Sequence, residues 1–557
     1  WRPGLIRDWR RTSSKGRAGA IARSRDPGEM LTQNKEEAMP NILLVYPKFP
    51  LSYWGFQFAM DFMGRKACMP PLGLVTVAGL FPSETYTLRV VDMNVETLSD
   101  THLSWADVVM TSSMIVQQES LYEVVRRCNK RALPIVAGGP HPTSYYDDIK
   151  RDLGRGNRVD HFLLGEVEET FPLFLEQLAH GDAREVYCEP TRPDGKVRKP
   201  DIGLTPLPRY DLLDLEAYHM MTVQFSRGCP WECEWCDITK LFGRITRTKT
   251  NEQMLREFQL LYELGWRGSV FLVDDNFIGN RRNALRLLPA LTQWQKAQGY
   301  PFALCTEASV DLVEHPELLT ALPEAGFGLI FCGIETLSLE ALLTMKKQQN
   351  TRKTAGGYEE HYLLQAVRKI QDQGIEVAAG FILGADGDTE ASFEAHIEFI
   401  QTAGIVMAME GLLTVLKDTA LYQRLEREGR LLGESGGNNV STALNFRPQI
   451  DRDTLIAGYK RVLATLYDPT LSNYFDRCWR MIQHLPPARY RVRRVGSREV
   501  RAFGKTLWRQ LPSRQGLAYA RFLARVLRHR PRMFPEAVRF AIEGYHFEKV
   551  TRQVVAG

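Results

Sequence analysis

The sequence predicts an α/β protein with two parallel sheets and a mainly helical C-terminal domain, and three observations support this fold class. Short apolar segments typical of buried strands alternate with amphipathic helical segments from residue 41 onwards. This alternation restarts after a stretch rich in Pro, Asp and Gly at residues 190–218, and the strand signal fades beyond about residue 420. Strands that alternate with helices over short loops form parallel sheets covered on both faces.

The composition is that of a globular protein, and the sequence disfavours a membrane-spanning or secreted protein. The chain has 557 residues, 44 % of them apolar and 25 % charged, so two or three folded units are expected. The sequence contains neither an apolar run long enough to cross a bilayer nor a secretory signal, which predicts a cytoplasmic protein. Nine cysteines, an odd number, suit a reducing compartment better than a disulfide framework.

Residues 39–189 are expected to form the first α/β domain. Residues 1–38 mix Arg, Lys, Ser and Gly and are expected to be a disordered extension, with Met39 as the natural start. Helical segments at 71–81 and 119–131 lie between strand candidates at 41–47, 86–92, 107–112, 133–139 and 160–166. This order predicts a Rossmann-like sheet, in which a ligand lies beyond the carboxyl ends of the strands.

A linker at 190–218 and a second α/β domain at 219–420 are expected to follow. Helices at 251–265 and 390–404 lie between strand candidates near 222–226, 269–273, 302–306, 328–332, 376–382 and 408–414. Six such units fall two short of a complete TIM barrel, so the sequence predicts a partial, TIM-like (β/α)6 barrel. Residues 421–557 then form a basic helical domain, with helical segments such as 517–530.

The positive charge of the chain is concentrated near the C-terminus. Residues 478–557 contain eighteen Lys or Arg residues and four acids, although the whole chain has a net charge of only +5. Such a basic region indicates an anionic partner, either lipid headgroups or nucleic acid. The alternative is a solvated helical face that binds nothing.

Three cysteines in the segment SRGCPWECEWCDI (226–238) give the strongest chemical signal. Cys229, Cys233 and Cys236 have a C-x3-C-x2-C spacing directly after the first strand of the predicted barrel. A structural zinc site needs four closed ligands, and the sequence offers no second CxxC pair and only His219 nearby. An iron–sulfur cluster with one iron left open uses three cysteines without a fourth ligand.

This cysteine loop, at the mouth of a predicted βα barrel, resembles that of the radical S-adenosylmethionine (SAM) enzymes. The resemblance implies that the three cysteines hold a 4Fe-4S cluster whose open iron binds SAM. It also implies which residues contact SAM: Trp235, Asp274, Asp275, Glu307, Glu335, Gly380, Ile382 and Gly384.

Some of these assigned SAM contacts have another explanation or depart from the family's pattern. Trp235 matches the family's aromatic residue against the adenine, but it could simply shield the cluster. Asp274 and Asp275 stand where the family usually has a Gly-Gly-Glu stretch, which is a departure from its pattern. Glu307 and Glu335 follow the third and fourth strands, where carboxylates also cap helices.

The first domain resembles the cobalamin-binding domain that precedes the barrel in one radical SAM subclass. It has no glycine-rich phosphate loop of the dinucleotide or ATP type. The segments VDMNVE (91–96), TSSM (111–114) and AGGPHPTS (137–144) carry the resemblance. It implies that cobalamin is held by Asp92, Asn94, Ser112, Ser113, Gly138, Gly139 and His141. As an alternative, the Ser and Gly residues are ordinary turn residues.

One position departs from the cobalamin motif D-x-H-x-x-G. Asn94 occupies the histidine position, and an amide is a poor cobalt ligand compared with imidazole. We therefore expect no strong lower axial ligand unless His141 approaches the metal.

Together the two resemblances imply a reaction. In these enzymes a 5′-deoxyadenosyl radical takes hydrogen from an unactivated carbon, which then receives methyl from methylcobalamin. The chain is thus expected to be a radical SAM C-methyltransferase with no general base. Segments 41–62, 222–244 and 269–280 are similar to the hopanoid C-2 methylase group, which implies a hopanoid or another lipid as the substrate.

Several partners and rival functions go with this expectation. A flavodoxin or ferredoxin would supply electrons, the basic region would touch the inner face of the membrane, and no nucleic acid is expected. One rival is a cobalamin-dependent radical SAM enzyme that catalyses a non-methylating rearrangement or cyclisation. The others are a tRNA-modifying radical SAM enzyme, whose aromatic RNA platforms are missing, and a cobalamin sensor, which would not need the three cysteines.

Overall fold

The computed structural model describes residues 39–486 and 496–557, so the predicted extension at 1–38 lies outside the described residues. The chain divides into two compact units. The first unit contains residues 39–48 and 73–212, and the second contains residues 49–72 and 213–557. Among the described residues, no helix combines the length and the apolar character needed to cross a membrane.

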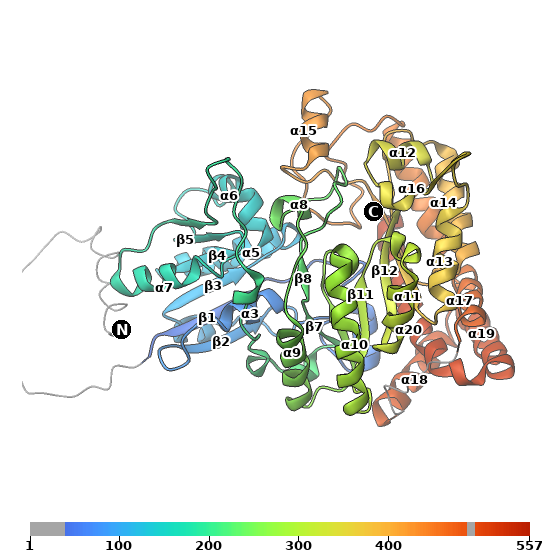
Figure 1. Ribbon diagram of the computed structural model, residues 1–557, viewed down its shortest axis with the longest axis horizontal. Coiled ribbons are helices and arrows are strands. Elements are labelled where there is room, and N and C mark those ends of the chain that lie inside the picture. Colours follow the sequence, from blue (N-terminus) through green and yellow to red (C-terminus); the bar gives the residue numbers. More distant parts are fainter. Residues whose placement is uncertain (1–38, 487–495) are drawn as a thin grey trace, which may run out of the picture. The chain divides into compact units, whose positions relative to one another are not determined.

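The first unit is built on a six-stranded, all-parallel sheet with the strand order β2-β1-β3-β4-β5-β6 (Figure 1). Its strands are β1 (Asn41–Tyr46), β2 (Thr87–Asp92), β3 (Val108–Ser112), β4 (Ile135–Gly138), β5 (His161–Leu164) and β6 (Val186–Cys188). The five strand candidates are confirmed, as is the Rossmann-like architecture. The edge strand β6 has only three residues, one of them buried, so it has too little apolar pattern to be predicted.

Helices cover both faces of this sheet. They are α3 (Leu72–Ala78), α4 (Asp100–Trp105), α5 (Gln118–Asn129), α6 (Pro140–Asp152) and α7 (Phe171–His180). In α5 the apolar residues Leu121, Val124, Val125 and Cys128 recur at helical spacing, and all are buried in one core that also contains β1. The spacing of these side chains therefore explains why α5 lies on the sheet.

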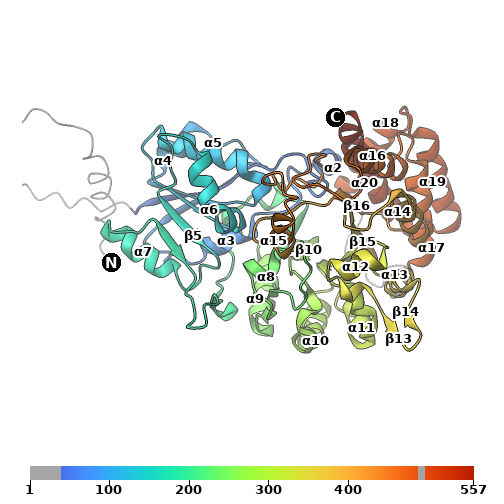
Figure 2. The same ribbon diagram turned by 90° about the horizontal axis from the view of Figure 1, so that it is seen from above.

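The second unit contains another six-stranded parallel sheet, in the order β16-β15-β12-β11-β10-β7 (Figures 1 and 2). Its strands are β7 (Met220–Val223), β10 (Ser269–Leu272), β11 (Ala303–Glu307), β12 (Phe327–Glu335), β15 (Glu376–Leu383) and β16 (Ala408–Leu412). The edge strands β7 and β16 do not pair with each other, so the barrel is open on one side. This confirms the predicted partial barrel.

The barrel helices follow their strands as expected for βα units. They are α8 (Ile238–Leu241), α9 (Asn251–Glu263), α10 (Arg281–Ala297), α11 (Pro316–Glu324), α12 (Leu339–Thr344), α13 (Tyr362–Asp372) and α14 (Glu390–Ala403). Two short antiparallel pairs complete the unit: β8 (Ser226–Arg227) with β9 (Arg247–Thr248), and β13 (Lys353–Thr354) with β14 (Gly357–Tyr358).

The C-terminal part of the chain is helical, as predicted. Its helices are α15 (Ala420–Arg427), α16 (Arg452–Leu466), α17 (Ser472–His484), α18 (Ser497–Gln510), α19 (Gly516–His529) and α20 (Phe534–Ala556). Arg539 of α20 forms an ion pair with Glu376 of β15, and Ile542 belongs to the apolar cluster on which Met220 of β7 packs. Helix α20 thus pairs with β15 and shares an apolar cluster with β7.

Two segments differ from the predicted domain limits. Residues 49–72, expected in the first domain, belong to the second unit, where α2 (Gln57–Met63) packs against α20. Most of the expected linker at 190–218 belongs to the first unit. There the Arg209 N–H donates to the Val75 carbonyl, and Thr205 donates to the buried Glu168. Long-range contacts of this kind leave no periodic signal in the sequence.

Gly384 follows β15 in a conformation that only glycine adopts without strain. Its φ is +100°, and a Cβ atom there would lie 2.9 Å from Leu455 Cδ2. We expect Gly384→Ala to lower the free energy of unfolding by about 2–4 kcal/mol, because backbone strain and overpacking add. Urea unfolding followed by circular dichroism measures the change.

The control for this variant is Gly436→Ala, where a Cβ would meet no atom within 4 Å. This control should change the free energy of unfolding by no more than about 0.5 kcal/mol. Equal stability of the two variants would contradict the assigned strain at Gly384.

Candidate functional site: a cysteine loop and a polar sheet edge

Two carboxylates that follow β10, one buried and one half-buried, hold the cysteine loop in place. Asp274 Oδ1 accepts hydrogen bonds from the backbone N–H groups of Phe225 (2.8 Å) and Ser226 (3.0 Å). Asp275 Oδ2 accepts from the Gly228 N–H at 2.7 Å. Burial raises the pKa of Asp274 to about 7, although its two backbone donors oppose this shift. Both aspartates were expected among the SAM contacts, and the structure gives them a contact with the loop backbone.

The three cysteines are free thiols, all half-buried. Two amides approach them: Gln349 Nε2 lies 3.3 Å from Cys233 Sγ, and Asn276 Nδ2 lies 4.0 Å from Cys229 Sγ. Such N–H groups donate to thiolates and stabilise their negative charge. The sulfur atoms therefore have donors suited to a metal-bound thiolate.

The donor set fits an iron–sulfur cluster better than a single metal ion. Among the described residues, no three His, Cys, Asp or Glu side chains lie close enough together to hold one ion. A closed zinc site would need four convergent ligands, whereas a cluster places its irons between three separated thiolates. The residues present thus fit the predicted cluster and disfavour zinc.

Glu335, at the end of β12, is held in an unusual conformation beside a buried lysine. Its φ is +66°, and the register between β12 and β15 shifts between Gly333 and Glu335. Lys347 Nζ forms an ion pair with Glu335 Oε1 at 2.8 Å, and both side chains are about one-tenth exposed. Burial disfavours the charged lysine, but Glu335 and the nearby cysteines outweigh burial and raise its pKa.

Trp235 connects this pair to the predicted adenine site. Lys347 Nζ lies 5.4 Å from the centre of the Trp235 ring. Trp235 and Ile382 both pack on an apolar cluster formed by the end of β16, helix α15 and Phe446. The structure thus packs two of the expected SAM contacts on one apolar cluster.

Glu307, the last residue of β11, lies on the same part of the barrel. Burial raises its pKa to about 8, with the neighbouring carboxylates of Asp275, Asp274 and Glu335 adding to the effect. The carboxyl group is therefore mostly protonated at neutral pH and can donate a hydrogen bond. Gly380 and Gly384 lie on and directly after β15, where a Cβ would approach Phe331 and Leu455, respectively.

A network of buried charges connects the cysteine loop to helix α15. Arg424 forms two hydrogen bonds with Glu234, through Nε at 2.7 Å and a terminal nitrogen at 3.0 Å. The other terminal nitrogen of Arg424 lies 2.6 Å from Asp386, which also pairs with Arg430. Because Glu234 lies between Cys233 and Trp235, this network fixes the backbone between an expected cluster ligand and an expected adenine contact.

The residues expected to bind cobalamin gather at the carboxyl edge of the first sheet. Asp92, Ser112 and Gly138 are the last residues of the parallel strands β2, β3 and β4; β1 lies between β2 and β3, and β4 is next to β3. Gly139 has a φ of +93°, and a Cβ there would lie 2.7 Å from Ser112 Oγ and 3.0 Å from the Ser113 nitrogen. This close approach of backbone to backbone leaves a polar edge that a corrin could cover.

Asn94 and His141 both have partners within the first unit. Asn94 donates to Asp92 Oδ1 from its backbone N–H (2.9 Å) and from its side-chain amide (2.7 Å). His141 is 1 % exposed, its Nδ1 lies 3.4 Å from Ser113 Oγ, and its ring contacts those of Tyr122 and Tyr145. Burial lowers the pKa of His141 to about 4, so the ring is neutral.

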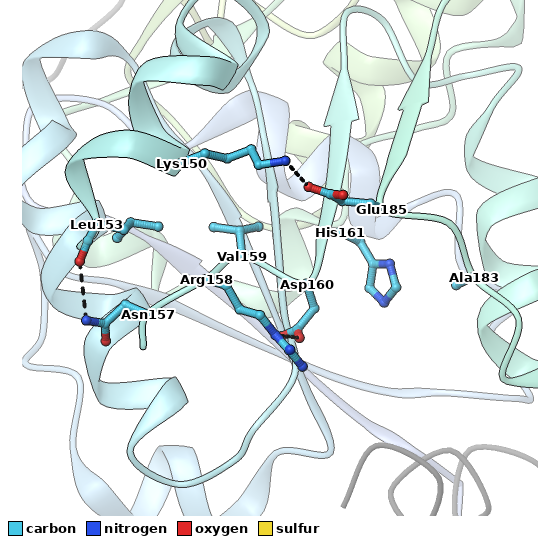
Figure 3. Close-up of a pocket in the computed structure, with 9 residues that line it drawn as sticks. All are labelled: Lys150, Leu153, Asn157, Arg158, Val159, Asp160, His161, Ala183 and Glu185. Carbon is cyan, nitrogen blue, oxygen red and sulfur yellow. Dashed lines mark hydrogen bonds and ion pairs between the residues drawn. The ribbon is translucent and has the colours of Figure 1, made fainter. Parts of the chain in front are cut away.

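A cavity of about 540 Å³ in the first unit lies away from this edge (Figure 3). It is lined where β5 begins, at His161, rather than where the strands end. Its charged residues pair with one another: Lys150 with Glu185 and Arg158 with Asp160. The cavity therefore adds no residue to the candidate cofactor site.

Three family descriptions match the chain in the order of its domains. Residues 64–175 match the B12 binding domain, residues 223–400 match the radical SAM superfamily, and residues 419–557 match a domain of unknown function, DUF4070. The fold and the cysteine loop thus define the class: a radical SAM enzyme with a cobalamin-binding domain.

Curated relatives identify the family. The chain is 39 % identical over 520 residues to an uncharacterized methyltransferase of Synechocystis. This match covers 92 % of this chain and 93 % of the relative. It is 36 % identical over 437 residues to the hopanoid C-2 methylase of Rhodopseudomonas palustris, and this match covers 77 % of each chain. The chain belongs to the family of cobalamin-dependent radical SAM methyltransferases that includes these two proteins.

Solved structures agree with the fold. The cobalamin-dependent SAM radical enzyme OxsB is 15 % identical, with a TM-score of 0.57 over 93 % of this chain and 80 % of that chain. The radical SAM methyltransferase TsrM from Kitasatospora setae, with cobalamin and a [4Fe-4S] cluster bound, is 15 % identical. Its TM-score is 0.55, over 90 % of this chain and 99 % of that chain. The predicted cofactors, a 4Fe-4S cluster, SAM and cobalamin, are confirmed for the family, whereas the individual site residues remain predictions.

Several residues of the site were missed by sequence reasoning. Asn276 and Glu234 lie inside the quoted motifs but are not themselves candidate ligands. Lys347 and Gln349 lie more than 100 residues beyond the cysteine loop, and Arg424 lies 190 residues beyond Glu234. No local pattern indicates such contacts, because the fold alone brings them together.

Arg424→Gln should destabilise the cysteine loop. The substitution leaves the buried Glu234 without its cation and leaves Asp386 with Arg430 alone, and breaking a buried pair costs about 3–5 kcal/mol. Because the Arg424 side chain is 23 % exposed, we expect a loss of about 2–3 kcal/mol and a lower iron content after anaerobic reconstitution. Urea unfolding and iron analysis measure the two effects.

Glu428→Gln is the matched control, because Glu428 pairs with the same arginine from a position that is 38 % exposed. This variant should keep its iron and nearly all of its stability. Normal iron binding by Arg424→Gln would show that the network does not support the loop.

Proposed function

We propose that the chain methylates an unactivated carbon of a hopanoid or another lipid, using SAM as the methyl source by way of methylcobalamin. The proposal rests on family membership, on the 36 % identical hopanoid C-2 methylase and on the cysteine loop at the mouth of the partial barrel. When bound to this chain, the cluster would supply the electron for SAM cleavage, and cobalamin would carry the methyl group.

In this proposal, each polar side chain of the barrel mouth has a binding task. Cys229, Cys233 and Cys236 hold the cluster, while Asp274 and Asp275 fix the loop from which they project. Trp235 and Ile382 enclose the adenine, and Gly380 and Gly384 lie on and directly after the strand that carries Ile382.

Carboxyl groups serve the other end of SAM. Glu307, with its raised pKa, can donate to an oxygen, and Glu335 accepts from ribose hydroxyls or from the amino group. Lys347 balances the charge of Glu335 in the buried site.

An apolar wall on the concave side of the barrel supports a lipid substrate. Trp54 Nε1 lies 2.8 Å from Met409 Sδ, and the Trp54 ring contacts Phe331 edge-to-face with centres 5.1 Å apart. All three side chains are half-buried. Met409 points away from α14, because its neighbour Glu410 faces that helix through His396. Phe331 is paired in register with Glu307, so this wall lies beside the candidate SAM site.

The partners that complete the proposal are an electron donor and a membrane. A flavodoxin or ferredoxin would reduce the cluster, and contact with the inner face of the membrane would give access to lipid. The alternative, a non-methylating rearrangement or cyclisation, has less support because the relatives that are 39 % and 36 % identical are both named for methyl transfer.

Lipid analysis tests the proposed function. A hopanoid-producing strain that lacks the gene should regain a lipid heavier by one CH2 when it receives the wild-type chain. Cys233→Ala should fail, because loss of one thiolate ligand removes the cluster. Cys188→Ala, a substitution of an exposed cysteine in the other unit, is the control for cysteine replacement as such. A product of unchanged mass would favour the rearrangement.

The expectation that cobalamin has no strong lower axial ligand in this protein has a spectroscopic test that does not depend on turnover. Asn94 is occupied with Asp92 and His141 is packed among tyrosines, so cobalt(II) bound to this chain should have no protein nitrogen ligand. Its electron paramagnetic resonance spectrum should lack nitrogen superhyperfine splitting, and Asn94→His should introduce it. Splitting in the wild type that disappears in His141→Gln would instead identify His141 as the ligand.

A further inference from the structure

Helices α18 and α19 expose an unusual concentration of large apolar side chains. Trp508 is 82 % exposed, Leu517 is 65 % exposed and Val500 is 60 % exposed. Leu527 and Leu511 are also exposed, by 52 % and 44 %. Isolated exposed leucines are normal on protein surfaces, but five large exposed apolar residues between positions 500 and 527, one of them a tryptophan, indicate a binding surface.

Helix α19 has apolar side chains on two opposite faces, one buried and one exposed. One face buries Tyr519, Phe522, Leu523 and Val526, where α19 packs against α17 and α20. The opposite face exposes Leu517, Ala520, Ala524 and Leu527, which recur at a spacing of three or four residues. No packing within the described part of the chain explains this second apolar stripe.

Three of the arginines near the exposed stripe have no acidic partner among the described residues. Between residues 497 and 535 the chain has ten Lys or Arg residues and one acid, Glu499. In the described chain, Arg514, Arg521 and Arg528 form no ion pair, and all three are exposed. Arg509 and Lys505, in contrast, pair with Asp61 of α2, so part of the charge serves the fold.

We propose that α18 and α19 form a membrane-binding surface for anionic phospholipid. Trp508, Leu511, Leu517 and Leu527 would enter the boundary between headgroups and acyl chains, while Arg514, Arg521 and Arg528 bind lipid phosphates. Tryptophan and arginine suit this boundary because each combines an apolar body with a polar end. The helices lie at the outer margin of the C-terminal helices in Figures 1 and 2.

Charge argues for lipid over the other occupants of an apolar surface. A second copy of the chain would bring together two regions that each have eighteen basic and four acidic residues, so the copies would repel. A nucleic acid would be expected to meet stacked aromatic side chains, whereas the stripe of α19 contains Leu and Ala. An anionic bilayer would accommodate the apolar stripe in its acyl region and bind the arginines with its headgroups.

Vesicle sedimentation tests the proposal with the full chain and without turnover, so its failure would leave the methyl-transfer proposal intact. Wild-type protein should bind vesicles of phosphatidylcholine with phosphatidylglycerol and bind pure phosphatidylcholine weakly. The double variant Trp508→Ser/Leu517→Ser should lose about tenfold or more in partitioning. The double variant Arg521→Gln/Arg528→Gln should lose about 30-fold on the anionic vesicles.

Matched substitutions elsewhere are the controls. Leu204→Ser changes a leucine that is 53 % exposed in the other unit, and Arg282→Gln/Arg286→Gln removes two exposed arginines of α10. Both should bind vesicles like the wild type. Circular dichroism confirms that each variant is folded, which is expected because the substituted side chains are exposed.

Insertion has a separate readout. Brominated phosphatidylcholine in the anionic vesicles should quench tryptophan fluorescence of the wild type, and the quenching should decrease in Trp508→Phe although binding persists. Absence of vesicle binding, or binding that Trp508→Ser/Leu517→Ser leaves unchanged, would overturn the proposal. Dimerisation in solution that this double variant abolishes would also overturn it, because the stripe would then bind a second copy.

Discussion

Hydrogen bonds and ion pairs from buried carboxylates shape the cysteine loop, and the rest of the site depends on them. The loop has little regular structure of its own, since only Ser226–Arg227 and Ile238–Leu241 flank it as β8 and α8. Asp274 and Asp275 bind its backbone from β10, and Glu234 is held from α15. Buried carboxylates without these donors and cations would be costly, so the loop and its supports form as one unit.

The C-terminal helices pack on the partial barrel. Arg539 of α20 pairs with Glu376 of β15, and Ile542 of α20 belongs to the apolar cluster on which Met220 of β7 packs. Residues of α15 and Trp235 belong to or pack on a second apolar cluster. The same C-terminal part of the chain places α18 and α19 on its outer side, where exposed apolar residues stand among arginines.

Local patterns in the sequence predicted most of the fold. Eleven of the twelve strands in the two large sheets have an apolar pattern that is sufficient by itself, and β6 is the exception because it is short and at an edge. The association of residues 49–72 with the second unit has no such pattern. It depends on contacts such as that of His546 with the Tyr53 carbonyl, at 3.0 Å and across 493 residues.

The sequence by itself determined the two parallel sheets, the open barrel and the three-cysteine loop, because side-chain periodicity and ligand spacing are local properties. Only the tertiary structure decided that Arg424 supports Glu234, that Lys347 pairs with Glu335 and that Trp54 contacts Phe331. These contacts join residues far apart in the chain. Their energies depend on burial and geometry, which arise only when the strands and the C-terminal helices pack together.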